Sequence, residues 1–223
     1  MPNVNASLIH LLPTIVPSSA PWTEALAAAA LKYSIANDKQ ELAHWLGQQV
    51  VETGRFTLFR ESLNYSVDRL LDIFSRTRIS AADAERYGRK SGRAANQQAI
   101  ANIVYGGAWG KKNLGNTQPS DGWHFRGAGP KQTTGRANFK RASQEIYGDD
   151  RLMTSPELLA QPEAGALAAA VYWSDARLRG IDAAARRNDY VEVRRLVNGG
   201  TNGLNGSDGT IEWTKKIQKL FNI

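Results

Sequence analysis

The 223-residue sequence contains no cysteine and only three histidines. Without cysteine, neither a disulfide framework nor a thiolate metal site is available. His10, His44 and His124 are scattered and do not show the spacing of metal ligands. The sequence therefore predicts a fold stabilised by packing, with no metal ion and no other cofactor.

Long apolar runs are also missing. The first ten residues, MPNVNASLIH, contain no basic stretch followed by an apolar one, and the alanine-rich segment EALAAAALKYSI is interrupted at each end by Glu24 and Lys32. This pattern predicts neither a signal peptide nor a membrane span. We therefore expect the chain to be made and held in the cytoplasm unless another factor releases it, without stable membrane insertion.

The composition is that of a folded protein, with 42% hydrophobic and 22% charged residues. The length suits one domain, and neither an internal repeat nor a low-complexity linker divides the chain. We expect a single domain over residues 1–223, with a helical extension over residues 1–37 and the core over 38–223. The sequence gives no sign of a second, separate binding domain.

The net charge of +7 is unevenly placed. Residues 55–151 carry 17 Lys and Arg against 9 Asp and Glu, a net +8, so the two ends together carry −1. An excess of positive charge favours a polyanionic partner, either nucleic acid or an anionic cell-wall polymer. An ordinary solvated basic surface is the other interpretation. Since no nucleic-acid motif accompanies the charge, we expect no nucleic-acid partner.

Most of the sequence has the periodicity of helices. Asn37 or Asp38 can cap a helix through DKQELAHWLGQQVVE, which places Glu52 in the last turn and Gly54 at the stop. Further helices are expected after Ser66, after Ser80, near Asn96, from Ser155-Pro156 through PEAGALAAAVYW, over DYVEVRRLVNGG and over TIEWTKKIQKLF. In the last of these we expect Ile211, Thr214 or Lys215, Ile217, and Leu220 or Phe221 to face the core.

Residues 106–135 lack this periodicity and contain eight glycines and two prolines. A stretch of this kind indicates an ordered, functional loop or a short irregular sheet. The predicted fold class is therefore mainly α, with a Gly-rich loop or a small irregular sheet around residues 106–135.

The segment VETGRFTLFRESLNYS is the strongest candidate for chemistry, because Glu52 and Glu61 lie nine residues apart with a helix stop between them. Two carboxylates suit glycoside hydrolysis, where one donates a proton to the leaving oxygen and the other activates water or acts as a nucleophile. The end of a helix and apolar neighbours such as Val50, Val51 and Phe56 disfavour ionisation and suit Glu52 to the acid role. Glu61, between Arg60 and polar residues, is better placed to stay ionised. An ordinary pair of surface glutamates remains the alternative at this point.

The chain resembles glycoside hydrolase family 19, a family of chitinases and phage endolysins with a lysozyme-like helical fold. The matching segments are ETG-F, ESLNYS, AIAN-VYGG, DGW-FRG-GPKQTTGRANF, an alanine-rich helix ending in YW, and VNGGTNGL, in family order from about residue 42 to 205. The resemblance implies a lysozyme-like fold, Glu52 as general acid and Glu61 as general base. It also implies inversion at the anomeric carbon, for which the carboxylates stand about 6.5–9.5 Å apart.

The same resemblance implies positions that bind sugar or water, at Gln132, Thr134, Asn138 and Asn198. Amides and hydroxyls can satisfy sugar hydroxyls without adding charge. The aromatic residues Tyr105, Trp109 and Trp123 are candidates for stacking on sugar faces, with core packing as the alternative. The basic residues Arg126, Lys131 and Arg136 are candidates for contacts with acidic groups of peptidoglycan stems, with structural salt bridges as the alternative.

Three positions depart from the family pattern. Val51 stands where His usually precedes the acid, Ala128 stands where GRGP has its arginine, and Asn205-Gly206-Ser207-Asp208 follows NGL in place of an Asp-Arg element. Loss of the guanidinium at position 128 changes the charge and hydrogen bonding expected near the acid.

We expect a peptidoglycan hydrolase of the endolysin type that cleaves the β-1,4 bond between N-acetylmuramic acid and N-acetylglucosamine. Its partners would be the glycan strands and, for access to them, a holin pore. We expect a monomer that stays in the host cytoplasm before lysis and then reaches the periplasm and cell wall. A chitinase of the same family and a catalytically weakened wall-binding protein are the alternatives.

Overall fold

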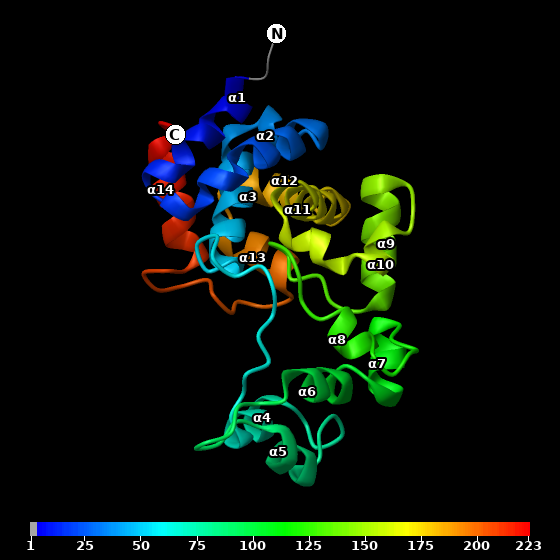
Figure 1. Cartoon of the computed structure of the whole chain (residues 1–223). Coiled ribbons are helices and arrows are strands. Elements are labelled where there is room, and N and C mark those ends of the chain that lie inside the picture. The colour runs from blue at the N-terminus through cyan, green and yellow to red at the C-terminus, as the bar shows by residue number, and fades with distance from the viewer. Residues whose placement is uncertain (1–3) are drawn as a thin grey trace. The chain divides into compact units, whose positions relative to one another are not determined.

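A computed structural model describes residues 4–223, and most of these residues are helical (Figure 1). The mainly helical fold class predicted from the sequence is confirmed. Pairing of extended backbone within residues 4–223 is restricted to isolated bridges, such as Arg60 with Ala128 and Ala128 with Thr133.

The chain divides into two compact units. Unit 1 contains the chain up to Phe59, Gly129–Lys131 and Leu158–Ile223; unit 2 contains Arg60–Ala128 and Gln132–Glu157. The elements of unit 1 are α1 (Val4–Ser7), η1 (Leu8–Thr14), η2 (Pro17–Trp22), α2 (Thr23–Lys32), η3 (Ile35–Asn37), α3 (Lys39–Glu52), α11 (Pro162–Arg177), α12 (Ile181–Arg186), α13 (Tyr190–Asn198) and α14 (Thr210–Leu220). Those of unit 2 are α4 (Val67–Ile73), α5 (Ala81–Tyr87), α6 (Gln97–Val104), α7 (Gly107–Leu114), α8 (Asp121–His124), α9 (Arg136–Tyr147) and α10 (Arg151–Thr154). The 3-10 helix η4 (Pro156–Ala160) lies where the chain passes from unit 2 to unit 1.

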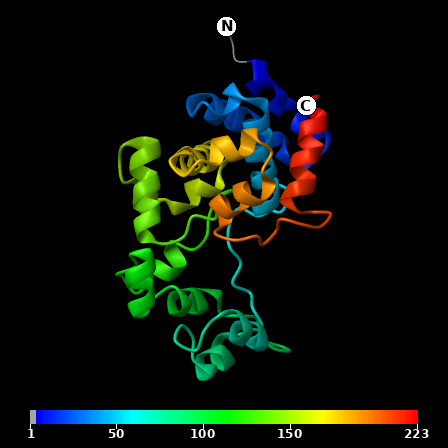
Figure 2. The same cartoon turned by 180° about the vertical axis from the view of Figure 1, so that it is seen from behind.

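Unit 1 is built around α3. Figure 2 shows the red α14 alongside the cyan α3, and α12 and α13 also contact α3. All ten residues from Glu41 to Val50 are buried, so this part of the helix is covered on every side. Gly47 allows the close approach of α14, because a Cβ atom at this position would clash with the Thr214 side chain.

A buried ion pair joins α3 to α11 within unit 1. The side chain of Glu41 is fully buried, and its Oε1 accepts hydrogen bonds from Arg177 Nη2 at 2.6 Å and from Trp173 Nε1 at 3.0 Å. Arg186 Nη2 donates to the other oxygen at 3.1 Å. Several donors thus compensate the removal of this carboxylate from water.

Residues 4–37 belong to the packing of unit 1. Ile9, Leu12, Trp22 and Leu26 are buried in the same apolar core as the residues of α3 and α11. The expectation of a helical segment here agrees with α1, η1, η2, α2 and η3. The division of the chain into one catalytic domain with an extension over residues 1–37 stays a prediction.

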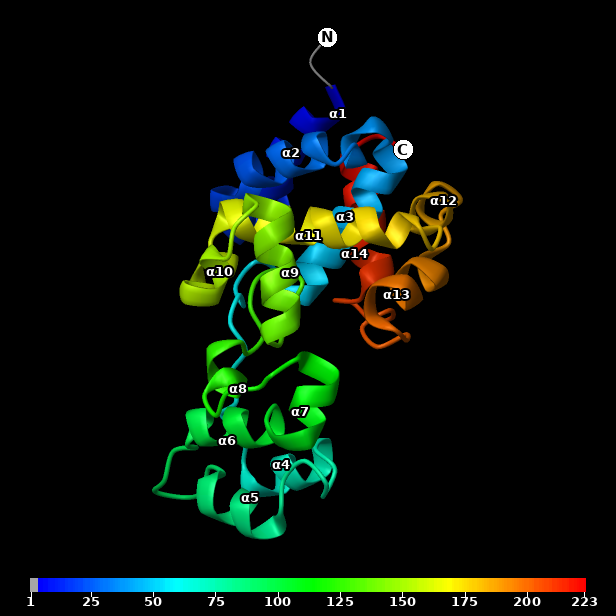
Figure 3. The same ribbon diagram turned by 90° about the vertical axis from the view of Figure 1, so that its right-hand side faces the viewer.

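Unit 2 has its own apolar cluster, which includes Leu63, Leu70, Phe74 and Ile100. Figure 3 shows α6 and α8 side by side in this unit. The helices predicted after Ser66, Ser80 and Asn96 are confirmed as α4, α5 and α6. In each case the predicted cap side chain accepts a hydrogen bond from the backbone N–H three residues later.

The expectation of a loop or irregular sheet over residues 106–135 is wrong for the 12 of its 30 residues that are helical. Two short helices, α7 and α8, form there, and the remainder is loop with the bridge from Ala128 to Thr133. Gly106 begins α7 in an extended conformation, and Gly115 ends it in the left-handed region with φ 67°. The glycines therefore mark the ends of a helix that is too short to show periodicity in the sequence.

Two other expectations about helices need correction. The α-helix expected from Ser155-Pro156 starts at Pro162, and residues 156–160 form the 3-10 helix η4. Gln161 is extended, since a residue before proline avoids the helical region. In α14 the buried residues include Trp213, Thr214, Ile217 and Gln218, so the core-facing side is rotated away from Ile211 and Lys215.

No helix formed by residues 4–223 has the length and apolar character needed to cross a membrane.

Candidate active site

Glu52 is the last residue of α3, as the sequence predicted. Thr53, the next residue, caps the C-terminal end of the helix. Its backbone N–H and its hydroxyl both donate to the Gln49 carbonyl, and Oγ1 lies 2.7 Å from that oxygen. Gly54 follows in the left-handed region with φ 53°. The cap and the glycine fix Glu52 at the end of the helix, where the backbone dipole is negative.

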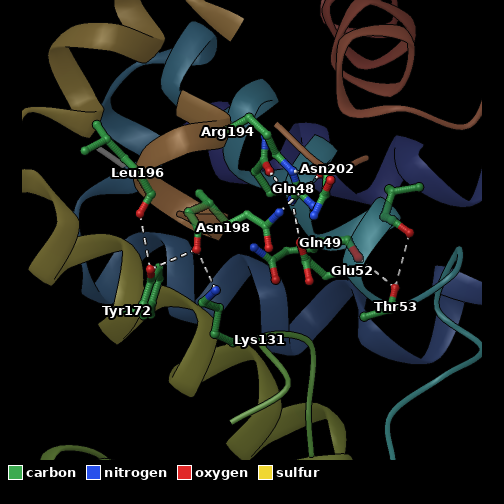
Figure 4. A network of polar contacts seen from close by, with 12 residues as sticks. Gln48, Gln49, Glu52, Thr53, Lys131, Tyr172, Arg194, Leu196, Asn198 and Asn202 are labelled. Carbon is green, nitrogen blue, oxygen red and sulfur yellow. Dashed lines mark hydrogen bonds and ion pairs between the residues drawn. The ribbon is translucent and has the colours of Figure 1, made fainter. Parts of the chain in front are cut away.

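Arg194 of α13 is the main partner of Glu52. Its guanidinium is almost fully buried and forms an ion pair with Glu52 through Nη1 and Oε1. Figure 4 shows this pair together with Gln48 and Asn202. Arg194 Nη1 also donates to Gln48 Oε1 at 3.0 Å, and Nε donates to the Asn202 carbonyl at 2.6 Å. These contacts hold the guanidinium in one orientation against the carboxylate.

Arg194 is a residue that the sequence analysis missed. The predicted surroundings of Glu52 were the helix end and apolar neighbours, and Val50 and Phe56 are indeed buried. Arg194 instead gives Glu52 a charged, buried partner. Arg194 is 142 residues from Glu52 in the chain, and the only signal in the sequence was the arginine missing at Ala128.

Asn198 ends α13 and is exposed, with its Nδ2 3.3 Å from the Asn202 carbonyl to which it donates. Its neighbours hold this end of the helix. Lys131 Nζ donates to the Val197 carbonyl at 2.8 Å, and the Tyr172 hydroxyl donates to the same carbonyl at 2.9 Å (Figure 4). Lys131 also lies over the Tyr172 ring at 4.1 Å. Lys131 is thus bonded within the protein to a carbonyl and a ring, not in the salt bridge considered as the alternative, and its contact with substrate stays a prediction.

Glu61 in unit 2 is held by backbone and phenol donors. Its backbone N–H donates to the Gly127 carbonyl at 2.9 Å, and Gly127 N–H donates to Glu61 Oε2 at 3.1 Å. The Tyr105 hydroxyl donates to Glu61 Oε1 at 2.5 Å. Each carboxylate oxygen thus accepts one hydrogen bond from a neutral donor.

Only glycine fits at position 127, because there is no room there for a side chain. A Cβ atom at position 127 would lie 2.8 Å from Gln132 Oε1 and 3.1 Å from Glu61 Cβ. Any side chain here would push these groups away, so the glycine allows the backbone amide to reach the carboxylate.

The pKa of Tyr105 is raised, first by burial and then by the charge and hydrogen bond of Glu61. Burial and the charge of Glu61 also raise the pKa of Tyr65. Both phenols therefore keep their protons at neutral pH, and Tyr105 acts as a donor. Its contact with Glu61 is a role that the sequence did not predict; the predicted stacking on a sugar stays a prediction.

Gln132, Thr134 and Asn138 lie close together in unit 2. Gln132 has φ 53°, a left-handed conformation that is uncommon outside glycine. The Thr134 hydroxyl donates to the Gln132 carbonyl at 3.0 Å, and Asn138 Nδ2 donates to the Thr134 carbonyl at 2.7 Å. The structure thus links these three predicted binding positions in one turn, and sugar binding by them stays a prediction.

Arg136 is engaged by a buried carboxylate. Its Nε and Nη2 donate to the two oxygens of Asp121 at 2.7 and 2.6 Å. Burial raises the pKa of Asp121, but hydrogen bonds from Arg136 and from the backbone of Gln118 and Thr117 outweigh it, so the pKa lies below its usual value. Two of the donors of Arg136 are therefore committed to structure, and its predicted contact with substrate remains untested.

Trp123 is partly buried at the edge of the apolar cluster of unit 2. The Arg126 guanidinium lies 3.6 Å from the centre of its ring. Trp109 is more exposed and has the Arg78 guanidinium over its ring at 3.8 Å. Each of these two rings already stacks on an arginine, and stacking on sugars stays a prediction for both.

Within the described part of the chain, residues 4–223, no three His, Asp or Glu side chains gather as metal ligands would. Independence of activity from metal ions stays a prediction, which EDTA treatment tests.

The structure places the predicted residues in two sets. Glu52, Lys131 and Asn198 belong to unit 1. The remaining predicted residues belong to unit 2: Glu61, Tyr105, Trp109, Trp123, Arg126, Gln132, Thr134, Arg136 and Asn138. Around one glutamate the structure adds a buried arginine, and around the other it adds a phenol and a backbone amide.

Comparison with known proteins gives a relative by sequence and a neighbour by fold. The chain is 30% identical over 181 residues to a glycosyl hydrolase family 19 domain-containing protein of Haemophilus influenzae, which covers 81% of each chain. Its fold is similar to the crystal structure of chitinase C from Streptomyces griseus HUT6037, with a TM-score of 0.56 and 17% identity over 95% of this chain and 75% of that one. A scan against protein-family models gave no match.

The fold is helical and has a chitinase as its structural neighbour. Together with the relationship to the Haemophilus protein, it defines a glycoside hydrolase of the lysozyme- and chitinase-like kind. The chain belongs to glycosyl hydrolase family 19.

Proposed function

We propose that this glycoside hydrolase is a peptidoglycan hydrolase of the muramidase type, cleaving the β-1,4 bond between N-acetylmuramic acid and N-acetylglucosamine with inversion. Glu52 is assigned as general acid and Glu61 as general base. Both assignments follow the family pattern in the sequence. The hydrogen bonds of Glu61 support its role, whereas the ion pair of Glu52 with Arg194 differs from the apolar surroundings expected for the acid.

The assignment of Glu61 as base is supported by its hydrogen bonds. A base that activates water must be ionised and must keep a lone pair for the water proton. Tyr105 and the Gly127 amide donate to different oxygens of Glu61. Since a carboxylate oxygen has two acceptor positions, each retains one for water.

The assignment of Glu52 as acid is supported by its fixed position at the end of α3. The carboxyl group is mostly enclosed, with its side chain 17% exposed, so one edge is open to a ligand. Arg194 contacts Oε1, and the described residues provide no hydrogen bond to Oε2. Oε2 is therefore the oxygen that we assign to proton donation.

The observation that carries the choice of peptidoglycan over chitin is the charge of unit 2. This unit has 15 Lys and Arg against 10 Asp and Glu, a net +5, whereas unit 1 has 13 against 11, a net +2. Chitin is uncharged, whereas the peptide stems of peptidoglycan carry carboxylates. A positively charged surface attracts the second polymer selectively.

For the biological setting, we propose an endolysin that accumulates in the host cytoplasm and reaches the periplasm and cell wall through a holin pore. It would act as a monomer, without nucleic acid and without insertion into the membrane. The motifs shared with phage endolysins support this setting.

Turbidity loss of outer-membrane-stripped Gram-negative cells, compared with sugar release from colloidal chitin, tests the substrate. The proposal predicts fast clearing of cells and little release from chitin. The reverse pattern would identify a chitinase. Binding to sacculi without any cleavage would identify the catalytically weakened wall-binding protein suggested by Val51 and Ala128.

A further inference from the structure

Two arginines of unit 2 lie on the backbone segments that hold Glu61. Arg60 directly precedes Glu61 and forms an antiparallel bridge with Ala128. Arg126 directly precedes Gly127, whose amide donates to the Glu61 carboxylate. Both arginine side chains are partly buried. Their positions are therefore fixed by the same hydrogen bonds that position the glutamate.

Neither arginine has a carboxylate partner. The Arg60 side chain makes no hydrogen bond or ion pair with residues 4–223, and its Nη1 is buried. Arg126 donates from Nη1 to the Trp123 carbonyl at 2.9 Å, while its Nε is buried without an acceptor in the described chain. Glu61 and Glu157 act on these arginines only through longer-range charge interactions.

Four other arginines of the same unit form ion pairs, and within residues 4–223 the rest of its arginines do not; Arg78, for example, donates to the Val104 carbonyl. Arg69, Arg136, Arg141 and Arg151 each form an ion pair with an aspartate or glutamate. Burial lowers the pKa of both Arg60 and Arg126, and the charge of Arg126 lowers that of Arg60 further. Both remain cationic at neutral pH. Partly buried cations without a counter-ion destabilise a protein, and a bound anion offsets this cost.

We infer that Arg60 and Arg126 form a carboxylate-binding subsite beside Glu61 that recognises the peptide-stem carboxylates of peptidoglycan. A guanidinium matches a carboxylate with two parallel hydrogen bonds, and stacking of Arg126 on Trp123 holds its plane in place. Chitin offers no group of this kind. The subsite thus explains selectivity for the charged glycan, and the inference rests on the proposed function.

The test measures binding, so that it does not depend on cleavage. The full chain carrying Glu52→Gln is pelleted with purified Gram-negative sacculi, either native or with their carboxylates converted to methylamides. We expect the parent to bind native sacculi about tenfold more tightly than amidated ones, because a hydrogen bond to a charged group is worth about 1.5–3 kcal/mol. Adding Arg60→Gln and Arg126→Gln should bring this ratio close to one.

The matched control is Arg69→Gln together with Arg141→Gln, which removes two charges of unit 2 from exposed ion pairs. This control should keep the ratio of the parent. A ratio unchanged by the Arg60 and Arg126 substitutions, or lowered equally by the control, would overturn the subsite. A different result would contradict the proposed function itself: the unsubstituted enzyme would release no muropeptides from native sacculi.

Discussion

The two glutamates of this hydrolase lie in contrasting surroundings, one in each unit. Glu52 ends a buried helix and faces a guanidinium that is itself anchored by Gln48 and Asn202. Glu61 lies on irregular backbone and accepts hydrogen bonds from Tyr105 and from a glycine amide. Helix packing and a cation thus hold the glutamate of unit 1, whereas neutral hydrogen-bond donors hold the glutamate of unit 2.

This contrast shows how one residue type can be prepared for two roles. A neutral donor can stabilise a carboxylate without neutralising its charge, which suits a base that attracts a water proton. An anchored cation holds one oxygen and leaves the other for the substrate. Substitutions that remove each feature separately test the comparison, and they are given from the largest expected effect to the smallest.

The largest effect is expected for Glu52→Gln. The amide keeps the shape and still accepts a hydrogen bond from Arg194, but it cannot donate a proton in the way that an acid does. We expect activity on sacculi to fall by about 10²–10⁴-fold, with an unchanged circular dichroism spectrum. A folded variant that keeps more than about a tenth of the wild-type rate would remove Glu52 from the acid role.

The next effect is expected for Glu61→Gln, which removes the base but keeps acceptors for Tyr105. Turnover should fall by about 10²-fold or more with little change in binding to sacculi, because the interaction with water forms mainly in the transition state. NMR of early products from the wild-type enzyme should show the α-anomer. An early β-anomer would indicate retention, with Glu61 as a nucleophile. An active Glu61→Ala variant would transfer the water-positioning task to Thr134 and Asn198.

A smaller effect is expected for Arg194→Met. The substitution leaves Glu52 and Gln48 without their shared donor, so the free energy of unfolding should fall by about 2 kcal/mol. Turnover should fall by about tenfold because the acid is no longer held in one orientation. Urea unfolding and initial rates measure the two effects.

The adjacent Arg195→Met serves as the control for this substitution, since Arg195 is 60% exposed in its weak ion pair with Glu192. It should change neither quantity by much. Equal effects of the two substitutions would show that Arg194 contributes only charge. Arg194→Lys should recover part of the turnover, because the charge stays while the three contacts cannot all form.

The smallest effect concerns His44, which is buried in α3 and bonded through Nε2 to Asn188 Oδ1 at 2.8 Å. Burial lowers its pKa from 6.5. The unfolded chain therefore takes up a proton at higher pH than the folded chain, and stability present above pH 6.5 is lost as the pH falls toward the folded-state pKa.

Between about pH 7.5 and 5.5 the free energy of unfolding should therefore fall. Urea unfolding at both pH values should show a smaller pH dependence for His44→Gln than for the wild-type chain. An identical pH dependence in the two proteins would show that His44 is not the group responsible.

The comparison also explains which features the sequence could predict. Helix caps at Asp38, Ser66, Ser80 and Asn96 were predictable, because a cap depends on residues only three positions apart. Glu52 at a helix end followed from the same local signals. The helix over Gly107–Leu114 was not predictable, since its glycines give no periodicity and its end depends on a left-handed Gly115.

Contacts between residues far apart in the chain could not be predicted from the sequence. Arg194 is separated from Glu52 by 142 residues, and Tyr105 from Glu61 by 44. The composition of these segments does not reveal that they meet. The choice among Arg126, Lys131 and Arg136 also needed the structure, because only the contacts show that Arg136 already pairs with a carboxylate, whereas Arg126 and Lys131 bond to backbone carbonyls.

Mass spectrometry of the fragments released from purified peptidoglycan tests the central claim most directly, because it identifies the bond that is cut. The account predicts muropeptides with N-acetylmuramic acid at the reducing end, released by the wild-type chain and lost with Glu52→Gln. Fragments with N-acetylglucosamine at the reducing end, or no fragments from a protein that cleaves chitin, would contradict it.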